Sequence, residues 1–233
     1  LEKSGIKFIF GKEITEISGE KVLAGSEEVA SGKVILVTTR EADLTALKDV
    51  KLEISNDNVV ANDKMQSSLK NIYVPGDVNG KNLLAHAAFK MGYIAASEIV
   101  EGKSDKYNNN VIPRAIYTYP EIGSVGLTEE EAKKSYDVKV GKFNYGANGR
   151  ALAHGDSSGM VKIISDARYG EILGAHIVGP RASELINEVS VLMQSEVIVE
   201  EAIKMVFGHP TFSEAIYEAI ADVEGVSVHL PKK

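Results

Sequence analysis

The chain has 233 residues, of which 44% are hydrophobic and 25% charged, and it contains no cysteine. These proportions are those of a globular protein with its own core, and a net charge of −7 argues against a nucleic-acid partner, which needs a basic surface. The lack of cysteine excludes disulfides and thiolate metal sites and fits a cytosolic location, and because no apolar run approaches the roughly 20 residues that span a bilayer, we expect no membrane partner.

The first forty residues predict strands. Residues 6–10 are mainly apolar, and residues 13–17 mix polar and apolar side chains in a roughly alternating pattern. Residues 32–37 contain the continuous apolar run 34–37, which is typical of a strand buried on both faces. The chain opens at Leu1 in a pattern like a helix end entering a strand, so we expect a piece of a longer protein.

The next segment predicts a strand followed by a long helix. Residues 71–74 repeat the buried-strand pattern, and Asn79-Gly80 predicts a turn. Apolar residues at helical spacing then predict a helix over about 83–100, with Gly102 as its stop.

The pattern changes after residues 103–110, which are polar and rich in turn formers and are the best candidate for a domain boundary. Thr128 and Glu131 form a capping-box pattern that predicts a helix start. The remaining pattern predicts strands at 112–118, 122–126, 138–145, 159–165 and 171–178, a hairpin turn at 166–170, and helices at 185–193, at 200–206 and after residue 211. Strands followed by helices in this order predict an α+β fold, in which helices pack on an antiparallel sheet.

An aspartate follows the predicted strand at 71–74. Open α/β sheets bind ligands where a strand ends and a helix begins, so the carboxylate of Asp77 could accept hydrogen bonds from sugar-like hydroxyls. An aspartate at this point could equally cap the turn or the next helix. The helix start near residues 83–86 would offer unpaired N–H groups to an anionic cofactor.

The segment Gly208-His209-Pro210-Thr211-Phe212-Ser213-Glu214 is the main candidate for chemistry. A carboxylate that bonds one imidazole nitrogen fixes the tautomer and leaves the other nitrogen as a proton acceptor, and Glu214 could do this for His209. Alternatively, Thr211 and Glu214 form a capping box and His209 merely precedes a helix. The spacing alone fits both. Such an acid–base pair would serve a thiol, which this chain lacks.

The other histidines offer no comparable pattern. His154 lies in a loop rich in glycine and serine, His176 in a predicted strand and His229 in the tail. None has a second ligand at metal-binding spacing, so we expect no metal site.

Several motifs, taken together and in order, resemble the carboxyl-terminal half of the flavin-dependent pyridine nucleotide-disulfide oxidoreductases, and within that family they are most similar to dihydrolipoamide dehydrogenase. The matching segments are 71–78, 84–88, 116–129, 148–151, 159–163, 173–180 and 209–214. The resemblance covers nearly the whole chain.

The resemblance implies roles for the candidate residues. FAD and NAD would be the cofactors, with Gly76 and Asp77 in the motif that bonds the flavin ribityl chain. The backbone at residues 84–86 (Leu84, Ala85 and His86) would face the flavin carbonyl side. His209, oriented by Glu214, would be the base that exchanges a proton with a redox-active dithiol on the partner subunit of a homodimer.

The resemblance also implies a division into domains and a reaction. Residues 1–40 would end the NAD-binding domain, 41–105 would belong to the FAD-binding domain, and 108–233 would form the dimerisation domain. The whole enzyme would oxidise a dithiol, dihydrolipoamide, through an active-site disulfide and FAD and reduce NAD. Its partner would be a lipoyl-bearing protein or a small disulfide substrate, and this chain alone would be inactive. Two alternatives stay open: a glutathione-, mercuric- or CoA-disulfide-type reductase, and a dimerisation module without activity.

Overall fold

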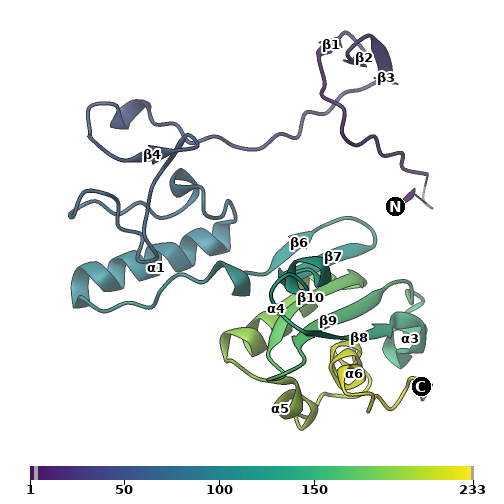
Figure 1. Cartoon of the computed structure of the whole chain (residues 1–233). Helices are drawn as coiled ribbons and strands as arrows, with labels where there is room; N and C mark the ends of the chain where they lie inside the picture. The colour runs from purple at the N-terminus through teal and green to yellow at the C-terminus, as the bar shows by residue number, and fades with distance from the viewer. Residues whose placement is uncertain (3–4, 232–233) are drawn as a thin grey trace. The chain divides into compact units, whose positions relative to one another are not determined.

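The computed structural model describes residues 1–2 and 5–231, which divide into two compact units, Leu1–Glu41 and Ala42–Lys233. Figure 1 traces the chain from the first unit in purple to the carboxyl terminus in yellow. The predicted division into three domains stays a prediction.

The first unit is a small antiparallel sheet of three strands, in the order β1 (Glu16–Ser18), β2 (Lys21–Ala24) and β3 (Glu27–Ser31). Glycines with positive φ make both turns, Gly19 at 58° and Gly25 at 66°. The alternating run at 13–17 therefore overlaps β1.

The strands predicted at 6–10 and 32–37 are wrong for this structure, because neither run has strand conformation. A strand is held by hydrogen bonds to a neighbouring strand, and no described segment pairs with either run. The apolar side chains stay exposed as a result, with Ile35 at 84% and Val37 at 89%.

The second unit begins with a short hairpin of β4 (Ile54–Ser55) and β5 (Asn58–Val59) and the 3-10 turns η2 (Thr45–Leu47) and η3 (Asp77–Asn79). The strand predicted at 71–74 is wrong in extent, since only Tyr73 forms an isolated bridge, to Gln66.

The long helix is confirmed as α1 (Ala85–Glu101). It ends at Gly102, which adopts the left-handed conformation with φ 64°, as predicted for the stop. Ala87, Met91 and Ile94 form its buried stripe and pack with Met65 in a small hydrophobic cluster. This cluster ties α1 to the loops that precede it.

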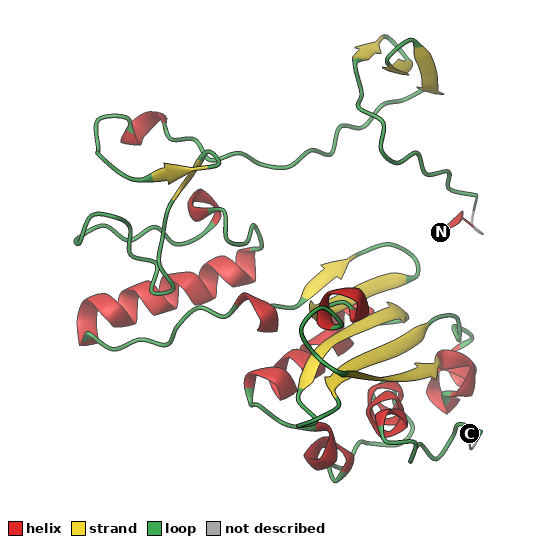
Figure 2. Ribbon diagram, in the orientation of Figure 1, coloured by secondary structure: helices red, strands yellow, loops and turns green. Residues whose placement is uncertain are grey.

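The rest of the unit is built on a five-stranded antiparallel sheet, shown in yellow in Figure 2. Its order is β6 (Arg114–Ile116), β7 (Glu121–Gly126), β10 (Ile172–Gly179), β9 (Met160–Asp166) and β8 (Val138–Asn144). The hairpin predicted between β9 and β10 is confirmed. The α+β class predicted from the sequence is therefore confirmed.

Helices cover both faces of this sheet. One face carries α4 (Ala182–Gln194), which contacts β7 and β10, and α6 (Glu214–Val223), which contacts β8 and β9. The short helices are α2 (Glu129–Ala132), α3 (Gly149–His154) and α5 (Val199–Ile203), with 3-10 turns η4 (Asn109–Val111) and η5 (Tyr145–Ala147). The capping box predicted at Thr128 and Glu131 is present at the start of α2.

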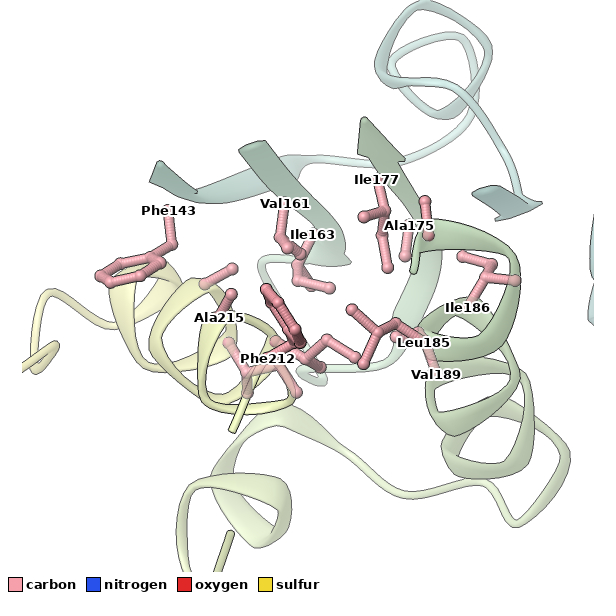
Figure 3. Packing of buried hydrophobic residues seen from close by; sticks show 14 of the residues in the cluster. Phe143, Val161, Ile163, Ala175, Ile177, Leu185, Ile186, Val189, Phe212 and Ala215 are labelled. Carbon is pink, nitrogen blue, oxygen red and sulfur yellow. The ribbon is translucent and has the colours of Figure 1, made fainter. Parts of the chain in front are cut away.

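Successive side chains along a strand point to opposite faces of the sheet, so the sheet has a separate core on each face. Ile163 of β9 packs in the large cluster beneath α4 and α6, while its neighbour Ile164 packs with Ala132 in a small cluster with α2. Figure 3 shows Phe212 and Ala215, at the start of α6, among the β-strand side chains of the large cluster. This core fixes where α6 begins. No helix in the described residues is long and apolar enough to cross a membrane.

Gly141 lets α6 approach β8 closely, and its replacement by alanine is expected to destabilise the domain. An added Cβ would lie 2.0 Å from the Ala219 carbonyl oxygen and 2.7 Å from the Val223 nitrogen, both backbone atoms. We expect the free energy of unfolding to fall by about 1–3 kcal/mol, as overpacking typically costs. In the control Gly146→Ala the added Cβ meets nothing within 4 Å. Equal urea midpoints for the two variants would contradict this packing.

Candidate active site

The His209 segment lies on the surface between α5 and α6 and joins the sheet domain through Phe212. The His209 side chain is 75% exposed, whereas Glu214, the first residue of α6, is 19% exposed. The His209 Nδ1 lies 2.8 Å from the Glu214 Oε1. The peptide bond between His209 and Pro210 is cis. The structure thus brings the two predicted catalytic residues together.

Both oxygens of Glu214 are used. Oε1 faces His209, and Oε2 accepts the backbone N–H of Thr211 at 2.8 Å. Burial alone would raise the pKa of Glu214, but the Thr211 N–H and the His209 ring outweigh it and hold that pKa below its ordinary value. The carboxylate is therefore kept ionised beside the imidazole.

The predicted capping box at this helix is only half formed. Glu214 accepts from the Thr211 N–H as expected, but the Thr211 hydroxyl donates to the Gly208 carbonyl at 2.7 Å. Ser213 occupies the position before α6 and makes no side-chain cap. One glutamate can serve the cap and the histidine together, because a carboxylate has two acceptor oxygens. The two interpretations of the sequence were not exclusive.

This geometry gives His209 one tied and one open nitrogen. A proton on Nδ1 satisfies the bond to the ionised Glu214, which leaves the Nε2 lone pair directed away from the carboxylate. With a ring this exposed, Nε2 is accessible to a group outside the chain. The pair can accept and return a proton.

A second histidine–glutamate pair escaped the sequence analysis. The His229 Nδ1 lies 2.8 Å from the Glu218 Oε1, and Glu218 is only 3% exposed. The Glu218 Oε2 also accepts the N–H of Val228 at 3.0 Å and the hydroxyl of Ser227. The tail is thus fastened to α6. The sequence feature that indicates this second pair is the spacing of Glu214 and Glu218, which are four residues apart and therefore lie on one face of a helix.

The predicted cofactor residues gather at the start of α1. Gly76 has φ 84° and ψ −159°, a conformation that essentially only glycine adopts, and an added Cβ there would lie 3.5 Å from the Ala88 Cβ. Asp77 opens η3, half-buried. The turn at 76–77 therefore lies against the first turn of α1.

The first turn of α1 is suited to an acceptor-rich ligand. Leu84 is its N-cap residue and offers no side-chain cap, so the N–H groups of Ala85 and His86 face outward from a positive helix end. This arrangement fits the carbonyl side of a flavin, which is rich in acceptors. The His86 Nε2 lies 2.7 Å from the Pro113 carbonyl oxygen, so its ring is engaged with the backbone.

Leu84 and His86 also line a cavity of about 760 Å³, together with Arg114, Ser183 and Asn187. Gly76, Asp77 and Ala85 are not among its lining residues. The predicted cofactor residues are therefore neighbours, but they do not form one closed pocket. Leu84 packs with the α1 cluster, whereas Phe212 of the His209 segment packs with the large cluster.

The remaining histidines have structural contacts. His176 lies in β10 as predicted, with Nε2 3.1 Å from the Leu127 carbonyl oxygen. His154 ends α3 rather than lying in a loop, and its ring meets Phe212 edge-on at 5.7 Å. Within the described part of the chain, no group of three or more His, Cys, Asp or Glu side chains could hold a metal ion.

Comparison with known proteins places this fold and these residues in a family. Residues 112–220 match the dimerisation domain of the pyridine nucleotide-disulphide oxidoreductases, and residues 1–92 match the pyridine nucleotide-disulphide oxidoreductase model. The chain belongs to the pyridine nucleotide-disulphide oxidoreductases.

Within this family, the chain is similar to dihydrolipoyl dehydrogenases. A dihydrolipoyl dehydrogenase of Bacillus subtilis is 40% identical over 78% of this chain and 40% of its own length. One from Mycobacterium leprae is 35% identical over 96% of this chain and 51% of its own length. The chain thus spans about half the length of the curated relatives it matches.

The fold agrees with a solved structure. LpdA from Mycobacterium tuberculosis superposes with a TM-score of 0.86 at 22% identity, over 95% of this chain and 50% of that one. At this identity the likeness supports the fold alone.

Proposed function

We propose that this chain is the carboxyl-terminal half of a homodimeric flavoenzyme that resembles dihydrolipoyl dehydrogenase. The enzyme oxidises a dithiol, of the dihydrolipoamide type, through an active-site disulfide and FAD, and reduces NAD. The observation that carries the proposal is the His209 Nδ1 held 2.8 Å from Glu214 with the other ring nitrogen open. The dihydrolipoyl dehydrogenases at 35–40% identity support it. A cytoplasmic location stays a prediction.

The cofactor residues have roles in this proposal. The Asp77 carboxylate, beside Gly76, would hold ribityl hydroxyls of FAD, and the backbone N–H groups of Ala85 and His86 would face the flavin carbonyl side. Bound FAD would supply the two-electron carrier between the sulfurs and NAD. This assignment is supported by the conformation of Gly76, which essentially only glycine adopts, and by the start of α1, which has no side-chain cap.

His209 moves the protons of the reaction. Oxidation of a dithiol to a disulfide releases two electrons and two protons, of which NAD⁺ takes up both electrons and one proton as hydride. The Nε2 of His209 removes a proton from the attacking thiol, which creates the nucleophilic thiolate. Glu214 stabilises the imidazolium that forms. The proton then leaves to solvent.

The sulfurs must come from outside this chain, which contains no cysteine. We place them on a second subunit that faces the exposed ring of His209 in a twofold dimer. The match of residues 112–220 to a dimerisation domain supports that arrangement. Light scattering at high concentration should give the dimer mass, and a monomer would count against it.

The test is to supply the missing portion. The reading frame upstream of Leu1 should encode a pair of cysteines separated by four residues, and its product, combined with this chain, should reduce NAD⁺ at the expense of dihydrolipoamide. This chain alone should show no such activity. Oxidation of the reduced nicotinamide cofactor by glutathione disulfide or by mercuric ion instead would assign another reductase of the family. An upstream frame without the cysteine pair would overturn the proposal in favour of an inactive dimerisation module.

A further inference from the structure

The bonds inside the His209 segment fix its own shape only. The hydroxyl of Thr211 donates to the Gly208 carbonyl at 2.7 Å, and its N–H donates to Glu214 at 2.8 Å. All of these partners lie between residues 208 and 214. A segment bonded only to itself would still be free to shift on the domain surface.

Contacts from distant parts of the chain hold the segment in place. The side-chain amide of Asn148 donates to the Thr211 carbonyl at 3.0 Å, across 63 residues of sequence. The Ser213 hydroxyl donates to the Glu188 Oε1 of α4 at 2.7 Å. Phe212, between them, is 6% exposed and edge-on to Tyr145 at 6.3 Å between ring centres. Thr211, Phe212 and Ser213 are thus each anchored.

Asn148 is the most deeply buried polar group of this set, at 2% exposure. Its Oδ1 accepts the Ala151 N–H at 2.9 Å and caps α3, so the orientation of the amide is fixed and its Nδ2 has a defined direction. Removal of Nδ2 leaves the Thr211 carbonyl without this donor, which destabilises the present position of Thr211 because an acceptor shielded from water needs a partner. We therefore expect Thr211 to shift when this bond is lost.

We infer that Asn148 is a positioning residue for the His209–Glu214 pair, a role that rests on the proposed function of that pair. It acts through Thr211: Asn148 holds the carbonyl of this residue, and the N–H of the same residue holds Glu214 Oε2. A shift of Thr211 moves the donor that fixes the carboxylate, and the carboxylate fixes the imidazole. Asn148 does not touch the histidine.

The variant Asn148→Ser tests this inference. Serine caps a helix start about as well as asparagine, so α3 is kept, but it is too short to reach Thr211. The readouts are the carboxyl ¹³C titrations of Glu214 and Glu218 and the ¹⁵N spectrum of the His209 ring. We expect the pKa of Glu214 to rise towards its ordinary value, because the Thr211 N–H is lost. The Glu218 pKa should stay low, because that residue is held by the tail.

A matched control is Asn82→Ser. Asn82 is 8% exposed, its Oδ1 accepts the Leu84 N–H at 3.1 Å, and its Nδ2 donates to Asn109 at 2.8 Å, so both amide ends are used as in Asn148. This variant should leave Glu214 and the His209 ring unchanged. Equal spectra for the pair in wild type and Asn148→Ser would overturn the inference.

If Asn148→Ser fails to fold, Asn148→Asp carries the same test at the His209 ring, since aspartate is nearly isosteric and keeps the cap but lacks the donor. An unchanged ring tautomer in that variant would also overturn the inference. Because the readout is the state of the pair and not turnover, a negative result is distinguishable from failure of the proposed reaction.

Discussion

The substitution His209→Gln is expected to lower dithiol-dependent NAD⁺ reduction by about 10²–10⁴-fold in the flavoenzyme that contains this chain. Glutamine keeps much of the size of the ring but cannot accept and return a proton. Because the His209 side chain is 75% exposed, the thermal unfolding midpoint should change little. Steady-state rates with dihydrolipoamide and a thermal melt of the same sample measure both effects.

His229→Gln is the matched control, since this ring lies at the same 2.8 Å distance from a glutamate of the same helix. If the bond to a glutamate alone made a histidine catalytic, both variants would lose activity equally. We expect the loss only at His209, because the proposed dimer places the sulfurs at that ring, whereas His229 belongs to the tail that Ser227 and Val228 fasten to Glu218. Equal losses of activity in two folded variants would contradict the assignment.

The largest effect on stability among the polar residues is expected for Glu218→Gln. The carboxylate is 3% exposed and accepts bonds from three tail residues, Ser227, Val228 and His229. Charge-assisted bonds of this kind are worth about 1.5–3 kcal/mol each in favourable cases and are not additive. We expect the free energy of unfolding to fall by about 2–3 kcal/mol at pH 7 in urea titrations.

This loss should depend on pH in a defined direction. Burial would raise the pKa of Glu218, but the bonds from Ser227 and His229 outweigh it and lower the pKa below that of an unfolded glutamate. A depressed pKa stabilises the folded state above the unfolded value, and the contribution is lost as the pH falls through the folded value. The difference between wild type and Glu218→Gln should therefore be full at pH 7 and shrink below about pH 4.

The exposed variant Glu224→Gln provides the comparison. Glu224 pairs with Lys139 on the surface at 2.9 Å and is 40% exposed, so its loss should change the unfolding free energy by less than about 1 kcal/mol. A difference at Glu218 that stays constant down to pH 3 would show that its carboxylate is not the source of the stability.

The sheet domain could be predicted from the sequence because its strands find their partners within this chain. The hairpin of β9 and β10, the capping box of α2 and the stop of α1 at Gly102 all follow from local patterns and are confirmed. The runs at 32–37 and 71–74 have equally strong patterns. Neither run forms a full strand. An apolar pattern indicates only that the side chains favour burial, whereas a strand also needs a neighbouring strand to which its backbone can hydrogen-bond.

The candidate site was predictable only in part. The spacing of His209 and Glu214 suggested their contact, and the structure confirms it at 2.8 Å. No local pattern connects Asn148 to Thr211, because the bond spans 63 residues and depends on how α3 packs against the His209 segment. The contact of His229 with Glu218 was missed because it depends on the helical spacing of Glu218 and on the tail folding back onto α6.

The proton state of the His209 ring gives the most direct test of the central claim, that Glu214 holds this imidazole with its outer nitrogen free. Long-range ¹H–¹⁵N spectra of the neutral ring distinguish a protonated from an unprotonated nitrogen. We expect the proton on Nδ1, towards Glu214, and an unprotonated Nε2, with this preference lost in Glu214→Ala. A neutral ring that carries its proton on Nε2, or a preference unchanged in Glu214→Ala, would contradict the claim.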